Sequence, residues 1–236
     1  MSNVVVLPLS SDQELVITSD NSGAIGEKPH DAVSTSNAVV GRFACRVAVM
    51  ECLAAGGDVQ AVVMQNFTDD EAWLDYKHGV EQILDELELD HIPITGSTES
   101  NFASLQSGLG LTIIGTRTIV KTSDFLGEEG FAVIGKPLVG SEVLEQPDEV
   151  APLWLFQRLC RLESVKALLP VGSKGVAAAW RSWTERTNKL ECRIDLEKSA
   201  GPATCFLIAY DNQNEAEIRE TAGSLFHKLI PIDEAE

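Results

Sequence analysis

The sequence predicts an α/β or α+β fold divided into two domains. Strand-like and helix-like segments alternate along its 236 residues, and such alternation is typical of proteins in which helices cover a sheet. Residues 121–130 interrupt this pattern with a polar, glycine-containing stretch. We take the stretch as the boundary between a first domain, residues 1–122, and a second domain, residues 123–236.

In the first domain, apolar runs that suit strands alternate with amphipathic stretches that suit helices. Residues 15–17 form the first apolar run. Asn37 is a suitable N-cap for a helix that runs to about residue 55, where Gly56 and Gly57 would end it. The pattern then predicts a strand at 59–64, a helix at 71–89 that begins after Thr68 or Asp69, and strands at 91–95 and 109–120.

The second domain repeats the alternation. The pattern predicts strands at residues 131–134 and 203–210, and helices at residues 151–162, 175–187 and 215–229. The first two of these helices contain Trp154, Trp180 and Trp183. Aromatic residues at helical spacing most often pack in a core, and stacking on a planar base is the alternative role for these three.

Composition and charge narrow the range of functions. The chain has 36 acidic residues against 18 lysines and arginines, which gives a net charge of −18. A surface this acidic repels a polyphosphate backbone, so we expect no nucleic-acid partner. No apolar run reaches the roughly 18 residues of a membrane span. The first residues also lack the basic start of a signal peptide, so we expect a cytoplasmic protein with no membrane partner.

Residues 17–28 carry the first functional signal, a strand that runs into polar and glycine residues. An acid, an amide, two glycines and a lysine follow one another there: Asp20, Asn21, Gly23, Gly26 and Lys28. Glycines let backbone N–H groups approach phosphate oxygens, the lysine adds a cation, and the aspartate suits a hard metal such as magnesium. Glu27 precedes the lysine, so the segment is not a standard P-loop. A solvated glycine-rich turn is the alternative interpretation.

A second signal is Glu51, which falls on the apolar stripe of the helix predicted at 37–55. It shares this stripe with Val40, Ala44 and Val47. A carboxylate on a packed stripe is costly unless a cation, a metal or several donors meet it. Two interpretations stay open. Either Glu51 lies at the edge of the stripe beside an arginine or water, or it faces a polar cleft and binds a metal together with Asp20.

The third signal is the sequence Gly-Ser-Thr-Glu at residues 96–99, which follows the strand predicted at 91–95. Here too a strand runs into hydroxyl groups and a carboxylate. Magnesium prefers oxygen ligands, so Asp20, Glu51 and Glu99 together suit a magnesium–nucleotide site. The alternative is a serine-type turn with a solvated Glu99.

In this order and spacing, the three segments resemble the superfamily of aminoimidazole ribonucleotide synthetase, selenophosphate synthetase, thiamine-monophosphate kinase and the hydrogenase-maturation dehydratase. The counterparts of its motifs are residues 18–26, 51–58, 96–99 and, in the second domain, 199–204. The chain departs from the pattern at Glu51, where the superfamily usually has Asp, and at Met50, where it has Asn. The resemblance implies a PurM-like two-domain α+β fold, with a mixed sheet and helices in the N-terminal domain and a smaller C-terminal α/β domain.

The resemblance also implies an activity. It implies an ATP-dependent phosphotransferase that uses Mg²⁺, acts on a small-molecule substrate and forms a homodimer. Within the superfamily, the sequence looks most like the α-ribazole kinases of cobamide salvage, which phosphorylate the 5′-hydroxyl of a benzimidazole riboside. A thiamine-monophosphate kinase-like enzyme and a non-catalytic nucleotide-binding or assembly module are the alternatives.

The implied roles of the residues follow the three segments. Asp20, Glu51 and Glu99 would hold magnesium directly or through water, and the first two are the candidate catalytic residues. The candidate nucleotide-binding residues are Asn21, Gly23, Gly26, Lys28, Asn66 and Thr98. Phosphoryl transfer depends mainly on positioning and on neutralising charge, which is the work these residue types can do.

Overall fold

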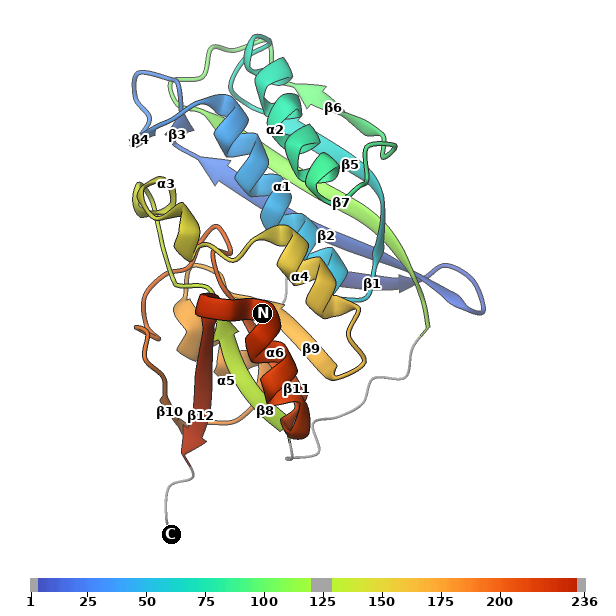
Figure 1. The fold of residues 1–236 in the computed structure, drawn as a ribbon. Helices are drawn as coiled ribbons and strands as arrows, with labels where there is room; N and C mark the ends of the chain where they lie inside the picture. Colours follow the sequence, from blue (N-terminus) through green and yellow to red (C-terminus); the bar gives the residue numbers. More distant parts are fainter. Residues whose placement is uncertain (1–3, 120–128, 233–236) are drawn as a thin grey trace. The chain divides into compact units, whose positions relative to one another are not determined.

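The computed structural model describes residues 4–119 and 129–232. The chain divides into two compact units, Ser2–Val120 and Lys121–Glu236, which we call the N-terminal unit and the C-terminal unit. Figure 1 colours them from blue to green and from yellow to red. Among the described residues, no helix is both long enough and apolar enough to cross a membrane.

The N-terminal unit is a five-stranded mixed sheet with two helices on one face (Figure 1). The strand order is β1-β2-β7-β5-β6, in which only the β5–β6 pair is parallel. The strands are β1 (Val5–Pro8), β2 (Gln13–Gly23), β5 (Asp58–Asn66), β6 (Ile94–Thr98) and β7 (Gly108–Thr118), and the helices are α1 (Asn37–Ala54) and α2 (Ala72–Glu86). A short parallel pair, β3 (Ile25–Gly26) and β4 (Val33–Ser34), lies between β2 and α1 in the chain.

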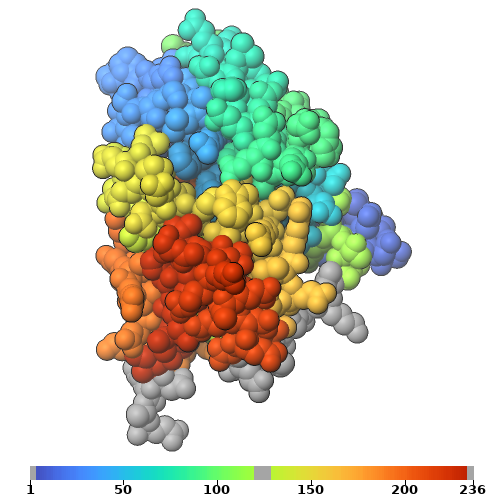
Figure 2. Space-filling view, viewed as in Figure 1, coloured from blue at the N-terminus to red at the C-terminus, as the bar shows by residue number. Residues whose placement is uncertain are grey.

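The two helices cover this face because the central strands alternate, and most of their buried residues point toward the helices. One polar contact ties the layers together: Thr18 Oγ1 of β2 donates a hydrogen bond of 2.6 Å to the carbonyl oxygen of Ala48 in α1. In the space-filling view of Figure 2, the side chains of α1 and α2 cover this face of the sheet. The buried strand residues beneath them are Val16, Val62, Met64, Leu111 and Ile113.

The opposite face of the same sheet has an apolar end. Val5 and Leu7 of β1 keep 51% and 45% of their surface exposed. In the register of the sheet, Ile17 lies beside Val5 and Leu15 lies beside Leu7, and Ile114 of β7 lies beside Ile17. Directly opposite residues of paired strands share a face, so these side chains form one continuous apolar surface on the side away from α1.

The C-terminal unit is a five-stranded antiparallel sheet with helices on both faces. The strand order is β10-β12-β8-β11-β9. Its strands are β8 (Glu129–Ile134), β9 (Val165–Pro170), β10 (Lys189–Glu191), β11 (Phe206–Asp211) and β12 (Phe226–Ile232). Its helices are α3 (Glu142–Glu145), α4 (Leu153–Cys160), α5 (Gly175–Thr184) and α6 (Glu215–Ala222), with single 3₁₀ turns at Pro147–Glu149, Asn212–Asn214 and Gly223–Leu225.

Aromatic pairs join the helices to the two faces of this second sheet. Phe131 of β8 packs edge to face on Trp180 of α5, with ring centres 4.8 Å apart. On the other face, Phe206 of β11 packs in the same way on Phe156 of α4, also at 4.8 Å. Trp180 is completely buried, so it is a core residue and is not available for stacking on a ligand.

The prediction of one helix over residues 215–229 is wrong for its second half, residues 223–229. Helix α6 ends at Ala222, and Gly223 then adopts a φ of +57°, which favours glycine and stops the helix. From Phe226 the chain forms β12, which pairs antiparallel with β8 and buries Leu229. A short apolar run fits either a strand or a helix by periodicity, and here pairing with β8 decides.

Other element boundaries also differ from the prediction. The N-cap of α1 is Ser36, whose Oγ accepts the Val39 N–H at 3.3 Å, and Asn37 is the first helical residue. The strand predicted from residue 203 begins at Phe206. The sequence pattern did not reveal β1, β9 or β10, which are short and lie next to turns.

Candidate functional site

Asp20 lies within a strand and not in a loop after one. Strand β2 continues to Gly23, and Asp20 pairs in register with the buried Leu111 of β7. Directly opposite residues share a face, so Asp20 points to the face that the helices cover. Burial raises its pKa to about 6, and a hydrogen bond with the backbone of Asn21 opposes this rise. Asp20 is therefore a partly desolvated carboxyl group that titrates near neutral pH.

Asn21 and Gly23 face the other way. Successive residues of a strand point to opposite faces, so the exposed Asn21 lies on the side of the sheet away from α1. Gly23 ends β2 beside Gly108, and a Cβ at Gly23 would meet no atom within 4 Å. Asp20 and Asn21 thus do not share one face of the sheet, although they are neighbours in the predicted motif.

Gly26 serves close packing between segments of the chain. Its φ is +152°, and a Cβ at this position would collide with the side chain of Ser107 and lie 3.0 Å from Oδ1 of Asn37. Glycine therefore lets the turn after β2 pass close to Ser107 and to the start of α1. Its predicted contact with a phosphate remains a prediction.

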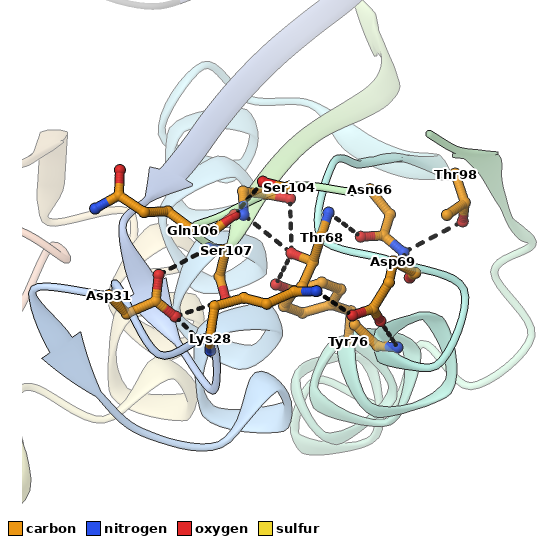
Figure 3. Close-up of polar contacts among 12 residues, drawn as sticks. Lys28, Asp31, Asn66, Thr68, Asp69, Tyr76, Thr98, Ser104, Gln106 and Ser107 are labelled. Carbon is orange, nitrogen blue, oxygen red and sulfur yellow. Dashed lines mark hydrogen bonds and ion pairs between the residues drawn. The ribbon is translucent and has the colours of Figure 1, made fainter. Parts of the chain in front are cut away.

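Lys28 is held at both its backbone and its amino group, as Figure 3 shows. The Lys28 Nζ atom lies 2.7 Å from Oδ2 of Asp69, while the Lys28 N–H donates to Oδ2 of Asp31 at 2.9 Å. Asp31 also accepts hydrogen bonds of 2.7 Å from the backbone N–H and from the hydroxyl of Ser107. The turn that carries Lys28 is therefore fastened to two other segments, residues 104–108 and the start of α2.

Asn66 is almost fully buried, and its side chain organises the turn that follows β5. Its Oδ1 accepts the Thr68 N–H at 2.9 Å. Its Nδ2 donates to the carbonyl oxygen of Asp69 at 2.6 Å and to Oγ1 of Thr98 at 3.2 Å. Asn66 and Thr98, which the sequence predicts as nucleotide-binding residues, are thus brought together by a hydrogen bond to each other, and the role predicted for them is not tested by this contact.

Glu51 and Glu99 lie near opposite ends of the N-terminal sheet. Cys52, next to Glu51 in α1, packs against Gly115 of β7, whereas the N–H of Glu99 donates to the carbonyl oxygen of Asn66. Asn66 pairs with Leu109. Six residues of strand separate Leu109 from Gly115, which corresponds to about 20 Å at ~3.4 Å per residue.

The magnesium site predicted from Asp20, Glu51 and Glu99 stays a prediction. Within residues 4–119 and 129–232, no three His, Cys, Asp or Glu side chains gather in a group that could hold a metal ion. The spacing along the sheet explains this finding, because Asp20, Glu51 and Glu99 stand at different levels of the strands. Burial raises the pKa of Asp20.

Sequence reasoning missed the partners that hold this site together. The sequence pattern indicates Asp69 only as a possible helix cap and gives no signal for Ser107. Asp69 does accept the Ala72 N–H at the start of α2, at 2.9 Å, but it also forms the ion pair with Lys28. Each pair joins residues far apart in the chain, so no local pattern of the sequence could indicate it.

The sequence matches no protein-family model and no curated protein. The structure, in contrast, matches solved structures over almost its whole length. The thiamine-monophosphate kinase of Aquifex aeolicus has a TM-score of 0.66 at 14% identity, covering 100% of this chain and 90% of that one. A structure described as AaThiL complexed with AMPPCP and TMP has a TM-score of 0.64 at 13% identity, covering 100% and 85%.

A protein of another activity shares the same fold. The Escherichia coli hydrogenase maturation protein HypE has a TM-score of 0.63 at 12% identity, covering 92% of this chain and 80% of that one. At identities this low, the likeness establishes the fold. The chain has the PurM-like α+β fold, which confirms the predicted fold class.

Proposed function

We propose that this chain is an ATP-dependent small-molecule kinase of the PurM-like superfamily. The observation that carries the proposal is the fold, which matches a thiamine-monophosphate kinase over all of this chain and 90% of that enzyme. A second such match was solved with AMPPCP, a non-hydrolysable analogue of ATP. For the acceptor we propose the 5′-hydroxyl of α-ribazole, because the residues at 20–28 and 199–204 resemble that group of kinases.

Asp20 suits a magnesium ion whose other ligands come mainly from the nucleotide. Magnesium usually binds through one or two carboxylates together with phosphate oxygens and water. Asp20 supplies such a carboxylate, and burial raises its pKa, so a bound cation would favour its ionised form. When bound, magnesium would neutralise charge on the phosphate oxygens of ATP.

The chain's own residues supply positioning around this carboxylate. Asp20 would orient the metal-bound nucleotide from the helix-covered face of β2. Lys28, whose side chain is 23% exposed, would contact phosphate oxygens. The predicted phosphate contacts of Asn21, Gly23 and Gly26 belong to the same proposal, as do the ligand contacts predicted for Asn66 and Thr98. The metal contacts predicted for Glu51 and Glu99, directly or through water, belong to the same proposal.

We also propose that two copies of the chain pair through the N-terminal unit. The supporting observation is the apolar end of the sheet on the side away from α1, where Val5 and Leu7 keep about half of their surface exposed. In most homodimers the same surface of each subunit meets across a two-fold axis, and this apolar surface could pair with a second copy of itself in that way. The resemblance to PurM-like proteins, which pair through their N-terminal domains, supports the same arrangement.

Two other functions have specific support. Thiamine-monophosphate kinase-like activity is favoured by the match to two structures of that enzyme. A non-catalytic nucleotide-binding module is favoured by the spread of the three carboxylates, which form no metal-binding group among the described residues.

Release of ADP with a panel of acceptors separates the three functions. The purified chain is incubated with Mg·ATP alone, with α-ribazole and with thiamine monophosphate. The proposal predicts ADP release that depends on α-ribazole and that Asp20→Asn abolishes. If ADP is released with thiamine monophosphate but not with α-ribazole, the chain would instead have thiamine-monophosphate kinase-like activity. Tight binding of Mg·ATP without ADP release for any acceptor would contradict kinase activity and identify a binding module.

A further inference from the structure

The ion pair between Lys28 and Asp69 joins two segments at one end of the N-terminal sheet. The Lys28 Nζ atom and Asp69 Oδ2 lie 2.7 Å apart, and their side chains keep 23% and 39% of their surface exposed. Figure 3 shows the Lys28 side chain extending from its own turn to Asp69 at the start of α2. The pair is therefore open to solvent and to a ligand.

Asp69 receives the contacts that a phosphate group takes in proteins. Its Oδ1 accepts the Ala72 N–H at 2.9 Å, at the N-terminus of the 15-residue helix α2. The Lys28 hydrogen bond and those from the backbones of Ala72 and Glu71 lower the pKa of Asp69. An ammonium group beside the N–H groups of a helix N-terminus is a favourable place for a negative oxygen. In this structure a side chain of the protein occupies that place.

The two ends of the ion pair can separate without disturbing the backbone. Asp31 and Ser107 hold the main chain at Lys28, through the 2.9 Å hydrogen bond from the Lys28 N–H and the two 2.7 Å bonds from Ser107. Asn66 holds the main chain at Asp69 through a 2.6 Å hydrogen bond to its carbonyl oxygen. Only the flexible Lys28 side chain has to move, and partly exposed ion pairs contribute little net stability.

We propose that Asp69 is a resident counter-ion of Lys28 and that a polyphosphate ligand exchanges with it. The inference rests on the proposed function, because it requires that Lys28 bind phosphate. A triphosphate carries several negative charges and competes well with one carboxylate for the lysine. A single phosphate ion competes poorly. Asp69 therefore lowers the affinity for all anions and excludes inorganic phosphate in particular, which makes it a specificity-determining residue.

The test is a calorimetric titration of the whole chain with Mg·ATP and, separately, with inorganic phosphate. Asp69→Asn removes the charge but keeps an oxygen that can accept the Ala72 N–H. We expect this variant to bind Mg·ATP about two- to fivefold more tightly than wild type, the size of a surface ion pair. We also expect inorganic phosphate, a weak ligand of wild type, to compete with Mg·ATP measurably in the variant.

Two controls isolate the ion pair. Asp70→Asn removes the same charge from the neighbouring, exposed residue and should leave both affinities unchanged. In a Lys28→Met background, the Asp69→Asn change should have no effect on Mg·ATP binding, since the cation that Asp69 occupies is gone. A purely structural role of Asp69 would not produce this dependence on Lys28. Asp69→Ser, whose hydroxyl can also accept the Ala72 N–H, serves if the Asn variant folds poorly.

The outcomes separate this inference from the proposed function. If wild type binds Mg·ATP and Asp69→Asn binds it equally or more weakly, the counter-ion role is wrong while the kinase proposal stands. The same conclusion follows if the tightening persists in the Lys28→Met background. If wild type does not bind Mg·ATP, the proposed function itself fails, whatever the variants do.

Discussion

Asp20 is an acidic side chain on the sheet face that packs mainly apolar residues against α1. An ionised carboxyl group loses hydration there, which is why its pKa rises to about 6. A bound cation would reverse that shift, because opposite charge favours the ionised form. The stability of the protein therefore depends on pH through this side chain, and so does the proposed affinity for metal.

We expect Asp20→Asn to stabilise the ligand-free protein at alkaline pH. The pKa of Asp20 is 3.8 in its unperturbed form and about 6 in the folded chain, so the folded state binds the proton more tightly than the unfolded state. The free energy of unfolding consequently falls as pH rises from about 4 to 6 and stays low above 6. Because Asp20 keeps some solvent contact, we expect a gain of about 1 kcal/mol for the variant, or about 2–4 °C in Tm.

Thermal unfolding at about pH 8 and about pH 5 checks this expectation. The stabilisation should be largest at the higher pH and smaller at the lower one, where wild-type Asp20 is mostly protonated. Asp58→Asn, which removes an exposed charge at the other end of the sheet, should show no such dependence. A loss of stability on Asp20→Asn at the higher pH would show that a neighbouring group already stabilises the charge.

Single residues differ in how far the sequence reveals them. Asp20 could be selected as a candidate because it lies three residues after an apolar strand run and precedes two glycines. The partners of Lys28 could not, because Asp69 and Ser107 reach this turn from distant parts of the chain. Their contacts depend on how β2, β5 and β7 are placed side by side, which local composition does not encode.

At the scale of elements, the turn between β2 and β4 depends on Gly26. This turn passes so close to Ser107 and to the start of α1 that only a residue without a Cβ fits. The same turn positions Lys28 two residues later. Its conformation therefore links the packing of the sheet to the proposed site.

Gly26→Ala should destabilise the protein by about 2 kcal/mol or more, because the new methyl group meets Ser107 and the backbone has a φ of +152°. Gly23→Ala is the matched control, since a Cβ there meets no atom within 4 Å. Urea unfolding of both variants measures the difference in the free energy of unfolding. Equal stabilities would mean that the turn does not pack as described.

Most helices and long strands were predictable, and the errors have a common cause. Helices α1 and α2 have long apolar stripes and clear end signals, so their periods are unambiguous. The segment from residue 226 is short and apolar, and pairing with β8 makes it a strand. The predicted loops after Ile17 and Thr95 are strand because neighbouring strands pair with them up to Gly23 and Thr98. In each case, a tertiary contact overrides the local pattern.

At the scale of the whole molecule, the apolar surface of the N-terminal sheet predicts self-association. Ile17 lies within that surface, beside Val5 and Ile114. An arginine at position 17 would place a charge in the centre of the proposed interface, where it would lose its hydration. Ile17→Arg should therefore convert a dimer into a monomer, as measured by sedimentation equilibrium.

Leu74→Arg provides the control, because Leu74 is 72% exposed on α2, which lies on the other face of the sheet. This variant should remain a dimer. Wild type that sediments as a monomer, or a Leu74 variant that dissociates as readily as the Ile17 variant, would contradict pairing through this surface.

The sequence motifs predicted the fold, which the structure confirms, whereas the metal centre predicted from them is a separate question. The three motifs and their order sufficed for the PurM-like fold, because a fold tolerates loose matches along the whole chain. The magnesium centre predicted from the same motifs stays a prediction. It requires oxygens within a few ångströms of one another, and residues in three motifs can belong to one fold yet lie about 20 Å apart along a strand.

Calorimetric titration with Mg·ATP at neutral pH tests the central claim most directly, with wild type compared against Asp20→Asn and with Asp58→Asn as the control. The account predicts that wild type and the Asp58 variant bind alike. It predicts that the Asp20 variant loses at least about tenfold in affinity, about 1.4 kcal/mol. It also predicts that the remaining binding of this variant no longer depends on magnesium, whereas that of the wild type does. Equal, magnesium-dependent affinities for wild type and Asp20→Asn would contradict the claim that Asp20 holds the metal-bound nucleotide.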